Sequence, residues 1–172
     1  MKRNMLAGLA VVIVVAFGVQ AQAADWETDF AKASTNASKS GLYMLLDFSG
    51  SDWCGWCEKL DKEVFSKPDF KTFAKANMVC VLVDFPHQKK QSKKVKDQNS
   101  ALAKKYGVKG FPTIVLLSSD GSLVGTTGYQ EGGAKKYVES LKGMIDEDKK
   151  KQPKKEDEKK AEPSKPAAGD GK

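Results

Sequence analysis

The chain contains two short, continuous apolar runs, at residues 42–48 and 78–85. Runs of this length without alternating polar residues are typical of strands that are buried on both faces, as in a parallel sheet. Such strands need helices on both faces of their sheet, and these two runs therefore favour an α/β domain.

Segments with helical spacing of apolar residues surround both runs. The predicted helices cover residues 26–39, 57–65, 66–76, 99–107 and 133–145, and a hairpin covers residues 111–128. In the first helix, Trp26 and Phe30 belong to one apolar pattern; in the third, Ser66 and Asp69 predict a capping box. The alternation of strands and helices, closed by an antiparallel hairpin, predicts a three-layer α/β/α sandwich with a mixed central sheet.

The N-terminal segment has the pattern of a secretory signal peptide. Lys2 and Arg3 precede an uncharged apolar run of 15 residues, 5–19, which is followed by the small-residue pattern Ala21-Gln22-Ala23. The run is shorter than the ~20 residues that a membrane-spanning helix needs. We expect cleavage after residue 23 and an exported, periplasmic or secreted product; an uncleaved anchor is the alternative.

The C-terminal segment, residues 146–172, contains nine Lys and eight acidic residues and has no aromatic or branched aliphatic side chain. A segment of this composition cannot bury a core, and we expect it to be disordered. The remaining residues, 24–145, have the size of one domain.

Positive charge is concentrated in one segment of this domain. Subtracting Lys2, Arg3 and the nine tail lysines from 29 basic residues leaves 18, against 14 acidic ones, so the domain carries only about +4. This charge gives no reason to expect nucleic acid as a partner. Five lysines lie within residues 87–96, where we expect a solvated loop; an acidic protein or envelope surface is the alternative partner.

The segment "GSDWCGWCEKL" places two thiols, Cys54 and Cys57, directly after the first apolar run. Zinc is one explanation, with Cys80 and His87 as the other ligands. Cys80, however, lies in the middle of a strand, where its side chain should be buried. A structural disulfide is a second explanation, but closing so short a loop removes only ~2 kcal/mol of chain entropy.

Thiol-disulfide exchange is the third explanation and the favoured one. Cys54 falls at the expected start of a helix, where free N–H groups and the helix dipole stabilise a thiolate and lower the pKa of the thiol. Cys57, almost one turn later, could then attack the mixed disulfide formed at Cys54. Trp53 and Trp56 would present a flat apolar surface to an extended polypeptide, or serve only in packing.

These residues resemble the thioredoxin superfamily. "DFSGSDWCGWC" is similar to its strand, loop and Trp-Cys-Gly-x-Cys motif, and "YGVKGFPTIVLL" to the segment with its cis-proline. The resemblance implies that Pro112 is cis and lies against the thiols, and that Phe111 presents backbone groups to substrate; an ordinary trans proline is the alternative. Gly128 resembles the glycine before the last helix.

Asp47 resembles the buried acid of this family, which moves protons to and from the second cysteine. Two departures bear on that role. The loop from Asp47 to Cys54 is one residue longer than in thioredoxin, and the next strand has no lysine opposite the acid; Cys80 falls near that place. Either Asp47 is more strongly desolvated, which would raise its pKa, or it only caps a loop.

The resemblance implies an exported thiol-disulfide oxidoreductase, with exported cysteine-containing proteins as substrates and a membrane electron donor. No histidine lies between the cysteines, and Asp52 and Glu58 are close by, so we expect a reductase or isomerase rather than a strong oxidant. We expect no cofactor or metal and a monomer. A binding module without turnover and a zinc-stabilised structural domain are the alternatives.

Overall fold

The computed structural model describes residues 26–151 and contains one mixed sheet with the strand order β2-β1-β3-β4. Its strands are β1 (Tyr43–Ser49), β2 (Met78–Asp84), β3 (Thr113–Leu117) and β4 (Leu123–Thr127). β1 pairs with β2 in parallel and with β3 in antiparallel orientation, and β3 and β4 form the predicted hairpin. The central position of β1 explains why its run of side chains is almost entirely buried.

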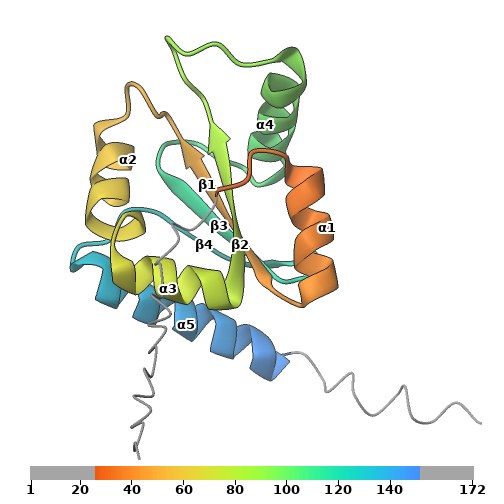
Figure 1. Ribbon diagram of the computed structural model, residues 1–172, viewed down its shortest axis with the longest axis vertical. Helices are drawn as coiled ribbons and strands as arrows, with labels where there is room; N and C mark the ends of the chain where they lie inside the picture. Colours follow the sequence, from red (N-terminus) through yellow and green to blue (C-terminus); the bar gives the residue numbers. More distant parts are fainter. Residues whose placement is uncertain (1–25, 152–172) are drawn as a thin grey trace, which may run out of the picture.

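Helices cover both faces of this sheet (Figure 1). α1 (Phe30–Ser40) and α4 (Lys93–Lys105) lie on one face. The other face carries α2 (Gly55–Leu60), a π-helical turn η1 (Asp61–Phe65), α3 (Pro68–Asn77) and α5 (Gly133–Lys151). The predicted three-layer α/β/α sandwich is confirmed.

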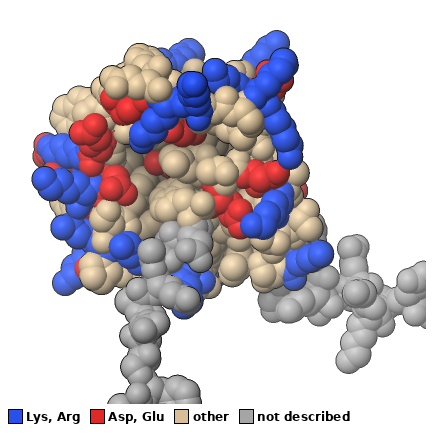
Figure 2. Space-filling model, turned by 45° about the horizontal axis from the view of Figure 1, so that its top comes forward, with Lys and Arg blue, Asp and Glu red and all other residues tan. Residues whose placement is uncertain are grey.

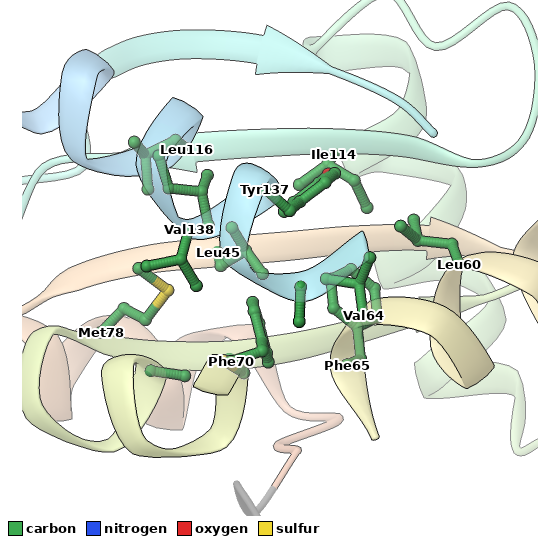
Figure 3. Close-up of a cluster of buried hydrophobic side chains, with 14 of the residues drawn as sticks. Leu45, Leu60, Val64, Phe65, Phe70, Met78, Ile114, Leu116, Tyr137 and Val138 are labelled. Atoms are coloured by element: carbon green, nitrogen blue, oxygen red, sulfur yellow. The ribbon is translucent and has the colours of Figure 1, made fainter. Parts of the chain in front are cut away.

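Two apolar clusters hold the layers together, one on each face. Successive side chains of a strand point to opposite faces, so Leu45 joins the cluster under α3 and α5, whereas Met44 and Leu46 join the cluster under α1 and α4. Figure 3 shows the first cluster, in which Leu45 and Ile114 of the sheet face Tyr137 of α5. Burying a side chain of this size stabilises the fold by about 1.5–3 kcal/mol.

The predicted start of the first helix was wrong. α1 begins at Phe30, because Asp29 accepts a hydrogen bond from Lys32 N and caps the helix there. Glu27 is extended and forms a bridge to Val81 of β2. Trp26 packs with the α3 and α5 cluster, on the sheet face opposite Phe30, so the two side chains belong to different layers.

Two other local expectations need correction. The capping box at Ser66 does not form: Ser66 donates to the Asp61 carboxylate, and Lys67 is the N-cap of α3 without a side-chain cap. The lysine-rich segment is only partly a loop, since Ser92 caps α4 and residues 93–96 are its first turn.

The last helix extends beyond the predicted domain end at residue 145, to Lys151. Tyr43 OH donates to Asp148 Oδ2 at 3.0 Å, which ties this extension to β1. The proposed signal peptide and the rest of the C-terminal segment lie outside the described residues. Between residues 26 and 151, no helix has both the length and the apolar character of a membrane span.

Candidate functional site

Cys54 and Cys57 lie at the start of α2, beyond the C-terminal end of β1, and are joined as a disulfide with a Cα–Cα distance of 5.3 Å. Cys54 is the N-cap residue, and Cys57 N donates to Cys54 Sγ at 3.2 Å. The predicted helix start beneath the first thiol is therefore present. A sulfur that receives a backbone N–H at a helix start is placed to carry negative charge.

The loop before Cys54 is held by bonds to the end of β2. Ser51 donates from its backbone N and its Oγ to the Asp84 carboxylate, at 2.9 and 2.6 Å. Trp53 Nε1 donates to Phe85 O at 2.8 Å. Gly50 is required here because a Cβ at this position would collide with the Trp53 ring. The loop is thus fixed before any substrate arrives.

Asp52 has a structural role in addition to its charge near the thiols. Its carboxylate accepts hydrogen bonds from the backbone N–H groups of His87, Gln88 and Lys89, at 2.8–3.0 Å. These bonds, the one from His87 first, hold the pKa of Asp52 below its ordinary value of 3.8. Asp52 therefore fastens the loop after β2 to the loop before Cys54, a role that its sequence position alone did not indicate.

Trp53 lies in an aromatic cluster. Its ring stacks on His87 at a centroid distance of 4.5 Å and meets Phe111 edge-on at 5.6 Å. Phe85 packs on Phe111 at 5.3 Å. Trp53 still exposes 42% of its surface, so it combines a fixed position with an open face.

Trp56 is more exposed, at 57%, and packs on Tyr129 at 5.2 Å. Lys59 Nζ lies over both rings, 5.0 Å from the Trp56 centroid and 4.9 Å from that of Tyr129. Tyr129 OH donates to Glu63 Oε2 at 2.6 Å. Tyr129 follows Gly128 directly in the sequence, a signal that could have identified it as part of the site.

The Phe111–Pro112 peptide bond is cis. Gly128 lies close to it: a Cβ on Gly128 would stand 3.1 Å from Pro112 O. Tyr137 OH donates to Gly128 O at 3.1 Å and holds this segment over α5. The structure thus brings Pro112 and Gly128 together, and the contact between Phe111 and Trp53 connects them to the thiol loop.

Asp47 is 7% exposed, and its Oδ1 has no hydrogen-bond partner among the described residues. Burial, followed by the charges of Asp61 and Asp84, raises the pKa of Asp47 from 3.8 to about 7. The more strongly desolvated of the two predicted environments is therefore the one present. Cys80 lies opposite Leu45 in the strand register, and Leu82 lies opposite Asp47.

The four ligands of the zinc alternative are not brought together. Cys80 is buried, and burial followed by the charge of Asp47 raises its pKa to about 12. His87 is exposed and stacks on Trp53. Within residues 26–151, no group of three or more His, Cys, Asp or Glu side chains is arranged to hold a metal ion.

Known proteins are similar to this chain in sequence and fold. Residues 30–144 match the family described as thioredoxin-like domain. The chain is 32% identical over 120 residues to a protein of Chlamydia pneumoniae named disulfide bond reductase DsbH. The matched region covers 70% of this chain and 72% of that protein. A solved structure of DsbH oxidoreductase superposes with a TM-score of 0.71 at 28% identity, covering 85% of this chain and 95% of that one. A thioredoxin from Thermus thermophilus, with a TM-score of 0.56 and 19% identity over 72% of this chain and 88% of its own, shares the fold.

The geometry and the relatives agree on the chemistry. Two cysteines at bonding distance lie at a helix start, next to two exposed tryptophans in the sequence and beyond the end of a central strand. The chain belongs to the thioredoxin-like family, and it is a thiol-disulfide oxidoreductase.

Proposed function

We propose that this protein is an exported reductase of protein disulfides, acting in the periplasm or outside the cell. The observation that carries the proposal is the hydrogen bond from Cys57 N to Cys54 Sγ at the start of α2. In the reduced protein, this N–H and the helix dipole stabilise a Cys54 thiolate, which is the form that attacks a disulfide.

The reaction transfers two electrons from the protein to its client. The Cys54 thiolate attacks one sulfur of the client disulfide, which breaks that bond, forms a mixed disulfide and releases one client thiolate. Cys57, once deprotonated, attacks Cys54 Sγ and releases the second client thiolate. The client leaves as a dithiol after taking up two protons, and the protein is left with the Cys54–Cys57 disulfide, the form described above.

Asp47 accepts the Cys57 proton in this proposal. Asp47 is buried, and its position two residues after Leu45 in β1 places it on the sheet face that α2 covers. Its pKa of about 7 matches proton transfer near neutral pH. The client chain is bound around the thiols by five residues: Trp53, Trp56, Phe111, Pro112 and Gly128. Their support is the contact of Trp53 with Phe111, the exposure of both tryptophans, and the approach of Gly128 to Pro112.

The reducing direction rests on two supports. The residues between the cysteines are Gly55 and Trp56, neither of which adds positive charge to stabilise the reduced form, and the Chlamydia pneumoniae relative is named a reductase. We therefore expect a reduction potential near thioredoxin's roughly −270 mV. A membrane dithiol donor would recharge the pair, and the protein would act as a monomer without a cofactor.

Insulin reduction with dithiothreitol as electron source tests the reaction, and equilibration with glutathione tests its direction. We expect turnover by the wild type and none by Cys54→Ser, while Cys57→Ser should accumulate clients as mixed disulfides. A potential above about −150 mV would indicate an oxidant and overturn the assignment. Partner binding that survives in Cys54→Ser, without turnover in the wild type, would instead identify a binding module.

A further inference from the structure

A cleft of about 530 Å³ lies beside Trp53, on the side of the loop that follows β2. Its apolar wall is made by Trp53, Phe85, Pro86 and Phe111. Trp53 immediately precedes Cys54, so the cleft borders the loop that leads to the reacting cysteine. Trp53 and Phe111, two of the residues proposed to bind the client, therefore also line the cleft.

Polar residues that line the cleft are held in place by hydrogen bonds. Asn99 of α4 is 1% exposed and donates from Nδ2 to Asp84 O at 2.9 Å. Gln91 Nε2 donates to the same carbonyl at 3.1 Å. The loop between them and Trp53 is fastened by the Asp52 carboxylate. A segment that binds here meets a fixed surface and has little ordering of the protein to overcome.

Positive charge gathers at this end of the molecule. Lys96 lines the cleft, and Lys89 and Lys90 lie in the loop beside it. Lys93 and Lys94 are paired with Asp97 and Asp29, but Lys89, Lys90 and Lys96 form no ion pair with any residue of the described chain. Figure 2 turns this end toward the reader and shows Lys side chains at the border of an uncharged central area, with Asp and Glu side chains between them.

The nearest carboxylates do not cancel this charge in full. Asp52 accepts three backbone N–H groups, and Asp84 accepts Ser51 N and Oγ. Lys89 donates to the neutral Ser51 Oγ at 3.1 Å and lowers the pKa of Asp52 by its charge. Within residues 26–151, two carboxylates thus lie near three lysines that form no ion pair, and Lys90 and Lys96 are exposed to an incoming ligand.

We propose that this cleft selects client segments in which an apolar or aromatic side chain is flanked by Asp or Glu residues. The apolar side chain occupies the space between Trp53, Phe85 and Phe111, and the acidic residues meet Lys96 and Lys90. This inference rests on the proposed reductase function and adds a substrate class to it. Charge complementarity of this kind acts mainly on encounter rate and on the choice between partners.

The test uses two disulfide-bonded peptides, each with a phenylalanine next to a cysteine. The positions around this phenylalanine carry Asp in one peptide and Lys in the other, and the peptides are otherwise identical. The measured quantity is kcat/KM for their reduction by the full chain with dithiothreitol, at low and high ionic strength. At low ionic strength we expect the acidic peptide to be preferred about five- to tenfold, and high salt to reduce the preference.

Charge reversal locates the effect. Lys96→Glu and, separately, Lys90→Glu should remove most of the preference for the acidic peptide. Lys104→Glu is the matched control: it makes the same change in net charge on the same helix as Lys96, but Lys104 does not line the cleft, and the preference should remain.

Equal reduction of both peptides by the wild type would overturn the inference and leave the reductase function standing. Loss of the preference in Lys104→Glu to the same extent as in Lys96→Glu would also overturn it, since net charge rather than the cleft would then be responsible. Failure to reduce either peptide would overturn the proposed function and the inference together.

Discussion

Replacing Asp47 by Asn should stabilise the folded protein at alkaline pH and change it little in acid. The carboxyl is buried in the sheet, and its Oδ1 has no partner in the described chain. At pH values well below 3.8 the group is protonated in both the folded and the unfolded state. Between its ordinary pKa of 3.8 and the folded-state value of about 7, the unfolded chain releases the proton while the folded protein retains it. The free energy of unfolding therefore falls as the pH rises through this window.

The size of the effect follows from the two pKa values. A difference of about three, at 1.36 kcal/mol for each pH unit, makes the ionised Asp47 cost the folded state on the order of 4 kcal/mol above pH ~7. Asn has nearly the same shape and carries no charge, so Asp47→Asn should recover most of this amount at about pH 8 and little at about pH 4.

Urea unfolding of the oxidised protein at several pH values measures this difference directly. Asp61→Asn is a suitable comparison, because the charge of Asp61 is the second cause of the raised pKa of Asp47. It should give a smaller gain in the same pH window. An equal effect of Asp47→Asn at acid and alkaline pH would refute the reasoning, since a difference without pH dependence cannot come from ionisation of the carboxyl.

Three further predictions concern the site. In the reduced protein, iodoacetamide should react with Cys54 at a pH where a free peptide thiol is still protonated. Urea unfolding should lower the reactivity of Cys54 to that of a free peptide thiol. Unchanged reactivity on unfolding would contradict a helix-stabilised thiolate. Trp53→Phe should lower the free energy of unfolding by about 1 kcal/mol, because the hydrogen bond from Nε1 to Phe85 O is lost. Trp56→Phe loses no such bond within residues 26–151 and should not lower it in this way. Equal losses in the two variants would mean that the Trp53 bond contributes nothing to stability. Gly128→Ala should slow insulin reduction, because the new Cβ would stand 3.1 Å from Pro112 O and overpacking of this kind costs about 1–3 kcal/mol. Gly125→Ala is the control, since its Cβ meets only the flexible Met144 side chain. Wild-type turnover in Gly128→Ala would show that the segment around Gly128 moves to accommodate the methyl group.

Much of the fold could be predicted because its signals are local. The apolar runs became β1 and β2, and the hairpin turn lies between β3 and β4 as expected. The capping box at Ser66 failed because a nearby carboxylate, Asp61, competes for the hydroxyl across a π-helical turn. The first helix started late because Trp26 packs on a face of the sheet that no helical spacing could indicate.

The features of the candidate site also fall into those that local sequence predicted and those that depend on distant residues. Cys54, Cys57 and the helix start beneath them were visible in the sequence, since spacing along one turn is a local property. The function of Asp52 was not, because its partners, His87 to Lys89, lie more than 30 positions away along the chain. The contact of Tyr129 with Trp56 was missed for the same reason.

The order of apolar and polar residues by itself determined the alternating strands and helices and the pair of thiols at the start of α2. Only the tertiary structure decided which groups surround them: the Asp47 oxygen that has no hydrogen-bond partner within residues 26–151, the bond from Trp53 to the loop after β2, and the lysines beside the cleft. The physical reason is that helix starts and buried strands depend on residues a few positions apart, whereas desolvation and charge at a site depend on segments that meet only after the sheet has formed.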